Sequence, residues 1–334
     1  MPSFGRRPSW CLLFLAPLAA ACGGPFPQST FANRSELAGA QSGLYTHILW
    51  FAIIVFIVVE GTLVFVLLRY RHRDGAPRPP QTHGHTVLEI TWTLAPALIL
   101  MLIAVPTVRT IFATAGDAPA GALRVEVIGH QWWWEYRYPD LGLVTANELH
   151  LPVGKPVAVA ITSADVIHSW WTPALGGKRD AIPNHVNHLA FTPDSVGMYQ
   201  GQCVEFCGAS HANMRLRTIV EPDSVFLAWV ADQRSAAAAP AKGSPAEQGQ
   251  QAFTRYGCIG CHTIAGVSSG IIGPNLTHVG SRTTIAGGTM MNTEDHLRAW
   301  IGDPPAMKPG SMMPKMGVPP ADISLLVAYL QSLK

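Results

Sequence analysis

The chain has 334 residues, of which 48% are hydrophobic and only 13% are charged, and its formal net charge is +2. This length predicts two or three domains, and the scarcity of charge predicts membrane-spanning segments beside globular parts. A net charge so close to zero argues against a nucleic-acid-binding protein, which would present a strongly basic surface.

Residues 1–22 are predicted to be an export segment. Arg6 and Arg7 provide a positively charged start, and the apolar run over residues 10–21 is too short to span a bilayer. The run ends in LAAAC at Cys22, which resembles the cleavage site of a bacterial lipoprotein, where the cysteine is lipidated. Plain signal cleavage with an unmodified Cys22 is the alternative, and both interpretations stay open.

Residues 23–115 contain two longer apolar runs, residues 46–68 and 88–112, each able to cross ~30 Å of hydrocarbon as a helix. Pro96 and Pro106 lie in the second run, and proline is tolerated in membrane helices. The loop between the runs carries arginines at positions 69, 71, 73 and 78. Because arginine-rich short loops stay in the cytoplasm, we predict a two-helix transmembrane hairpin, with everything after it on the external side.

The sequence changes character after the hairpin. Residues 116–234 contain segments such as LRVEVIG and RLRTIVE, rich in β-branched residues and separated by turns, which predict an all-β sandwich. Residues 235–245 read SAAAAPAKGSP, a typical linker composition, and at ~3.1 Å per residue an extended linker of this length would reach ~30 Å. Residues 246–334 show helical patterns at both ends and predict a compact all-α domain.

The sandwich region contains a run of potential metal ligands, CVEFCGASHANM. It supplies Cys203, Cys207, His211 and Met214, and His168 lies upstream in DVIHSWW. Two thiolates, two imidazoles and a thioether form a soft ligand set that favours copper in an electron-transfer role. A disulfide and a zinc site are the alternatives. A disulfide would not need the histidines, and zinc would gain nothing from Met214.

The last domain carries the sequence CIGCH at residues 258–262. The C-x-x-C-H pattern is the attachment signal for c-type haem. Cys258 and Cys261 would bond the vinyl groups of the porphyrin, and His262 would be held under the iron as its fifth ligand. The sequence therefore predicts a covalently bound haem c in this domain.

Four blocks together resemble the successive motifs of cytochrome c oxidase subunit II: GHQWWWEYRYPD, DVIHSWW, KRDAIPNHVNH and YQGQCVEFCGASHANM. The resemblance runs from the first apolar run to about residue 230 and implies a cupredoxin-like sandwich that holds the binuclear copper centre CuA. Cys203 and Cys207 would bridge the two coppers. His168 and His211 would be terminal ligands, and Met214 would be a weak axial ligand.

The same resemblance implies three further roles. The backbone carbonyl of Glu205 would bind one copper, while its side chain would face a magnesium or manganese ion at the joint with subunit I. Trp132 would be where electrons enter from cytochrome c, or its ring only packs against the sandwich. Glu89 would lie at the mouth of a proton-uptake path in subunit I, or it is simply a carboxylate at the membrane–water boundary.

Residues 246–334 resemble the class I cytochromes c. In the segment KPGSMMPKMG, the methionine directly before proline is Met313, which would be the sixth ligand of the haem iron, with Met312 as its close rival. The resemblance also implies a closing helix near the C-terminus that lays Tyr329 against Phe253 and Tyr256 of the domain's first helix.

A subunit II domain fused to a cytochrome c domain resembles the caa-type oxidases of bacteria. The implied function is electron transfer from a soluble or membrane-bound cytochrome c, via haem c and CuA, to haem in subunit I, where oxygen is reduced with proton translocation. The partners would be subunit I and further membrane subunits in the bacterial cytoplasmic membrane, with both redox domains on the periplasmic or extracellular side. A CuA-bearing subunit of a nitric oxide reductase and a free-standing membrane-anchored electron carrier are the alternatives.

Overall fold

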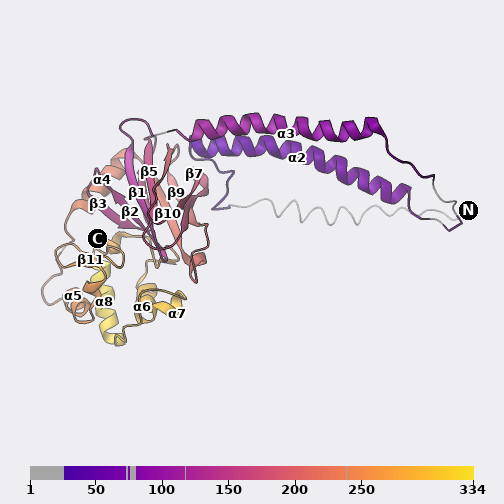
Figure 1. The fold of residues 1–334 in the computed structure, drawn as a ribbon. Helices are drawn as coiled ribbons and strands as arrows, with labels where there is room; N and C mark the ends of the chain where they lie inside the picture. The colour runs from indigo at the N-terminus through magenta and orange to yellow at the C-terminus, as the bar shows by residue number, and fades with distance from the viewer. Residues whose placement is uncertain (1–25, 73, 76–79, 117, 238) are drawn as a thin grey trace, which may run out of the picture.

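The computed structural model describes residues 26–72, 74–75, 80–116, 118–237 and 239–334. Two long helices run side by side away from a sandwich of two β-sheets, and the helices of the C-terminal region gather on another side of the sandwich (Figure 1). The helical hairpin, the sandwich and the helical C-terminal domain follow one another as predicted. The predicted export segment, with Cys22, lies outside the described residues.

The hairpin consists of α2 (Glu36–Arg69) and α3 (Thr86–Thr114), which are 34 and 29 residues long and apolar enough to cross a membrane. Most of their large apolar side chains are exposed in the chain alone, which fits helices that face lipid or partner subunits. Pro96 and Pro106 lie inside α3 without ending it.

The first turns of α2 extend the predicted run, which was expected to begin at residue 46. Ser35 caps the helix by accepting a 3.1 Å hydrogen bond from Ala38 N. Leu37 and Ala38 are buried against the sandwich, and the Glu36 carboxylate accepts a 2.8 Å hydrogen bond from Thr192 N. The helix therefore begins where it is fixed to the sandwich, and its apolar run begins later.

The sandwich consists of two five-stranded sheets with the strand orders β3-β2-β1-β5-β8 and β4-β10-β9-β6-β7. Alternate residues of β5 are fully or nearly fully buried, the pattern of a strand with one face toward the core. The core between the sheets is aromatic, with Trp134, Tyr136 and Trp170 fully buried. The strands are β1 (Leu123–His130), β2 (Trp133–Tyr138), β3 (Leu143–Ala146), β4 (Glu148–Pro152), β5 (Val157–Ser163), β6 (His168–Thr172), β7 (Gly176–Ala181), β8 (Asn187–Phe191), β9 (Gly197–Cys203) and β10 (Arg215–Glu221).

The C-terminal domain follows α4 (Asp223–Arg234) and is built on a crossing of its first and last helices. At Gly249 a Cβ would come within 2.0 Å of Leu325 O, so only glycine permits this approach. Phe253 and Tyr329 pack edge to face with ring centroids 5.9 Å apart, as predicted. The elements are α5 (Pro245–Arg255), β11 (Thr263–Ile264), β12 (Ser268–Ser269), β13 (Thr284–Ile285), β14 (Met290–Met291), α6 (Glu294–Gly302), α7 (Pro304–Met307) and α8 (Pro320–Ser332).

Candidate functional sites

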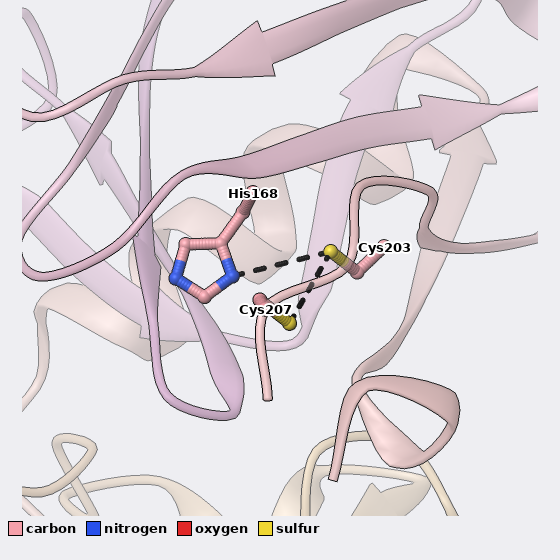
Figure 2. Close-up of side chains that lie close together, drawn as sticks. All are labelled: His168, Cys203 and Cys207. Carbon is pink, nitrogen blue, oxygen red and sulfur yellow. Dashed lines mark hydrogen bonds between the residues drawn. The ribbon is translucent and has the colours of Figure 1, made fainter. Parts of the chain in front are cut away.

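The side chains predicted to bind copper converge at one end of the sandwich. His168 opens β6, Cys203 ends β9, and Cys207 lies in the loop that leads to β10 (Figure 2). Cys203 Sγ is 3.9 Å from His168 Nδ1 and 3.8 Å from Cys207 Sγ. The two sulfurs are much farther apart than the ~2.05 Å of a disulfide bond, and both thiols are free.

The rest of the loop completes this group of donors. Cys207 Sγ lies 3.5 Å from His211 Nδ1 and 3.9 Å from Met214 Sδ. The backbone oxygen of Glu205 is 3.3 Å from Cys203 Sγ, while its side chain is exposed. Two thiols, two imidazoles, a thioether and a carbonyl suit copper, whereas a tetrahedral zinc site has no use for the thioether.

Asp165, which the sequence reasoning did not single out, holds the ring of His168. Its Oδ1 is 2.7 Å from His168 Nε2, and its Oδ2 accepts a 2.6 Å hydrogen bond from Gln131 N. Burial lowers the pKa of His168, but Asp165 and Cys203 together outweigh this effect and leave that pKa raised. With Nε2 bonded to the carboxylate, the imidazole presents Nδ1 to the cysteines. The sequence feature that could have identified Asp165 is its position three residues before His168 in DVIHSWW.

The two thiols titrate as a tightly coupled pair. The hydrogen bond from Cys207 lowers the pKa of Cys203 to about 4 against the opposing effect of burial, and the same interaction raises the pKa of Cys207. One thiolate is therefore present at neutral pH, and the second proton must leave when a metal binds.

A cavity of about 380 Å³ lies between the C-terminal domain and the sandwich. Cys258, Cys261 and His262 line it together with Met312 and Met313, so the structure brings together all the residues predicted to hold haem c. Apolar side chains form most of its remaining wall in the C-terminal domain, among them Phe253, Leu276, Ile285, Leu297, Ile301 and Leu326.

The surroundings of His262 suit a metal ligand in the wall of this cavity. His262 Nδ1 is 2.9 Å from Pro274 O, which fixes the tautomer and leaves Nε2 free for iron. Burial lowers the pKa of His262, so the imidazole is neutral. A Cβ at Gly273 would come within 2.5 Å of the His262 ring, so glycine is needed there. Of the two rival methionines, Met312 is 72% exposed and Met313 is partly buried.

Trp132 lies between the two sites. Its indole Nε1 donates a 2.9 Å hydrogen bond to the carbonyl oxygen of Cys207, and its side chain lines the haem cavity. Only 8% of the residue is exposed, because the C-terminal domain covers it. A Cβ at Gly310 would come within 3.1 Å of the ring. The residue predicted to receive electrons from cytochrome c thus faces the chain's own C-terminal domain.

Glu89 lies apart from both sites. It is in the first turn of α3, at the end of the hairpin away from the sandwich (Figure 1). Its Oε1 accepts a 3.2 Å hydrogen bond from His85 N, and the side chain is otherwise exposed in the chain alone. The described residues of this chain therefore do not bring Glu89 near the copper or haem ligands.

Comparison with known proteins gives the same organisation. The transmembrane domain of cytochrome c oxidase subunit II matches residues 27–110, its periplasmic domain matches residues 142–221, and cytochrome c matches residues 246–334. A solved structure of the periplasmic domain of subunit II of cytochrome oxidase from Bradyrhizobium japonicum is 36% identical and covers 35% of this chain and 96% of that chain, with a TM-score of 0.34.

Full-length relatives extend the similarity along the chain. Cytochrome c oxidase subunit 2 of Alkalihalophilus pseudofirmus is 38% identical over 288 residues, which cover 84% of this chain and 83% of the relative. The Bacillus subtilis protein of the same name is 33% identical and covers 97% of this chain and 96% of the relative. The chain therefore belongs to the cytochrome c oxidase subunit II family, as a membrane-anchored component of an oxidoreductase complex that carries a fused C-terminal cytochrome c domain.

Proposed function

We propose that electrons enter a caa-type cytochrome c oxidase through this chain. They would come from a soluble or membrane-bound cytochrome c and pass by way of haem c and CuA to haem in subunit I, where oxygen is reduced to water with coupled proton translocation. Trp132 carries the proposal, because its side chain lines the haem cavity while its Nε1 bonds to the carbonyl of Cys207.

The chain's own residues would hold the two cofactors and shield them from water. When bound, the haem iron and the copper pair supply reversible one-electron chemistry. His168 and Met214 are fully buried and the two cysteines nearly so, which favours a rigid ligand set that rearranges little between oxidation states. The copper ligands would be His168, Cys203, Glu205, Cys207, His211 and Met214. The haem would be held by Cys258, Cys261, His262 and Met313.

The proposal extends to the surfaces that meet subunit I. Glu205 turns its carbonyl toward Cys203 and its carboxylate outward, which supports a magnesium or manganese ion between that carboxylate and subunit I. Phe206 beside it is 78% exposed, a large ring that a partner surface would bury. Glu89 would lie at the mouth of a proton-uptake path in subunit I. Both redox domains would lie on the periplasmic or extracellular side of the bacterial cytoplasmic membrane.

Metal analysis of the purified complex tests this function. We expect a copper pair and one haem c per chain, and oxygen consumption with reduced cytochrome c. Cys207→Ser should remove the copper and leave the haem, and Cys261→Ala should disturb haem attachment and leave the copper. Zinc in place of copper would overturn the assignment. Reduction of nitric oxide instead of oxygen, with a matching large subunit, would favour the nitric oxide reductase alternative.

A further inference from the structure

The cytochrome c domain receives a buried carboxylate from the sandwich. Glu148, the first residue of β4, is 2% exposed. Its carboxylate accepts hydrogen bonds of 2.6–3.1 Å from the backbone N–H groups and the hydroxyls of Thr283 and Thr284. These donors all belong to the cytochrome c domain, so each bond crosses the joint between the domains. A carboxylate taken out of water is stable there only while these donors surround it.

Lys308 brings a buried amino group to the same joint from the cytochrome c domain, and burial lowers its pKa to about 7. It is 4% exposed, and its Nζ donates to the carbonyl oxygen of Trp132 at 2.6 Å and to that of Ala286 at 3.1 Å. Trp132 belongs to the sandwich and Ala286 to the cytochrome c domain, so one amino group joins both. The side chain of Lys308 also lines the haem cavity.

Further close contacts join the two domains near Lys308. Arg215 N of the sandwich donates a 2.9 Å hydrogen bond to Gly287 O, and Ser210 Oγ donates a 2.6 Å hydrogen bond to Pro309 O. Gly287 has a φ of 73°, and a Cβ there would lie 2.7 Å from Trp132 O. A side chain at Gly287 would therefore be strained and would press the two domains apart.

We propose that Glu148 and Lys308 are positioning residues that hold the cytochrome c domain permanently over Trp132. The inference rests on the proposed function and adds two consequences to it. Electron transfer from the haem to the copper then needs no movement of the domain. External cytochromes cannot reach Trp132 and must deliver their electrons to the cytochrome c domain instead.

The physical reason is that a buried polar group with its hydrogen-bond partners in the other domain permits only one orientation of the two domains. If the domain slid or rotated while it stayed in contact, Glu148 would lose its donors and Lys308 would lose its bond to the carbonyl of Trp132, and neither group would regain water. The linker at residues 235–245 would by itself let the domain move over ~30 Å. The contacts of Glu148 and Lys308 remove that freedom, so the linker serves as a connection and not as a hinge.

Cutting the linker in the intact oxidase complex tests the proposal. A specific protease site is inserted in the exposed turn at Lys242, and the purified complex is cleaved and passed through a size-exclusion column. We expect the haem fragment to stay with the complex. In the double variant Glu148→Ala and Lys308→Met, the equilibrium constant for docking of the fragment should fall by more than about tenfold. The fragment should then elute separately from the complex. Asp232→Asn and Lys334→Met, both at exposed positions, are the matched controls and should retain it.

Copper and haem c contents and both redox potentials are measured before cleavage. A complex without copper or haem would refute the proposed function, whereas the retention of the fragment reports only on the positioning residues. The inference fails if the haem fragment leaves the cleaved complex of otherwise native sequence, a result that needs no substitution and no refolding. It also fails if the double variant, with copper and haem c still bound, retains the fragment as firmly as the controls do.

Discussion

The indole Nε1 of Trp132 donates a 2.9 Å hydrogen bond to the carbonyl oxygen of Cys207, whose sulfur is a proposed copper ligand. The same carbonyl accepts a 2.8 Å bond from Gln131 Nε2, so the loop has two donors at this point. Both residues border the haem cavity, but of the two only Trp132 brings an aromatic ring to its wall. A short covalent and hydrogen-bonded connection therefore runs from the wall of the haem cavity to the sulfur of Cys207.

Trp132→Phe should slow electron transfer from the haem to the copper severalfold. Phenylalanine keeps an aromatic ring at the cavity wall but has no N–H for the carbonyl of Cys207, while Gln131 still holds the loop. The copper spectrum should therefore change little. The measurement is the rate of copper reduction after rapid photoreduction of the haem. Trp133→Phe is the control, because that ring stacks on His130 at 4.2 Å. Equal rates in the two variants would contradict the connection.

Asp165→Asn should weaken copper binding by about 10- to 100-fold, the usual cost of losing an outer partner of a metal-binding histidine. Asparagine can still bond to His168 Nε2, but it removes the negative charge that raises the pKa of that ring. A copper titration of the purified complex measures the loss. Asp232→Asn, at an exposed position of α4, serves as the control. An affinity equal to that of the control would show that Asp165 does not support the site.

The ligands could be predicted from the sequence because most of each set is local. Cys203, Cys207, His211 and Met214 fall within twelve residues of one loop, and CIGCH is continuous. Of the copper ligands, only His168 lies outside this loop, and the motif DVIHSWW identified it. Such spacing constrains a site without knowledge of the fold around it.

The docking of the two domains could not be predicted in this way. Glu148 and Thr283 are 135 residues apart, and an acid at the start of a strand is ordinarily a solvated residue. Lys308 stands in a proline- and glycine-containing segment whose resemblance to cytochromes c drew attention to its methionines. The burial of Glu148 and Lys308 depends on packing between the two domains, and a local sequence pattern carries no information about such packing.

Glu135→Gln should destabilise the sandwich at neutral pH by about 1–3 kcal/mol, the usual contribution of hydrogen bonds to a charged group. Burial alone raises the pKa of Glu135, but its bonds to His130 and Arg137 outweigh burial and leave the pKa below the ordinary value of 4.5. The native carboxylate therefore adds stability that is full above about pH 4.5 and is lost as the pH falls through its lowered native pKa.

Thermal unfolding of the two proteins between pH 7 and pH 3 measures this dependence. The difference between native Glu135 and the glutamine variant should shrink as the pH falls, because a protonated carboxyl resembles an amide in charge. Asp180→Asn, at an exposed position of β7, should show no comparable trend. A difference that stays constant over this range would show that the carboxylate charge does not stabilise the fold.

Met313→Leu should lower the reduction potential of the haem, and Met312→Leu should not. Both methionines line the haem cavity, but Met312 is 72% exposed and Met313 is partly buried, as a ligand enclosed with the iron must be. Thioether ligation raises the potential of a c-type haem, and axial ligands together tune potentials over ~0.8 V. Leucine has nearly the volume of methionine but no sulfur, so packing is kept while the ligand is lost.

A redox titration of each variant gives the potential of the haem. The copper spectrum, read in the same sample, should be unchanged in both variants. A fall in potential with Met312→Leu alone would move the sixth ligand to Met312, and a fall in neither variant would place it outside this pair.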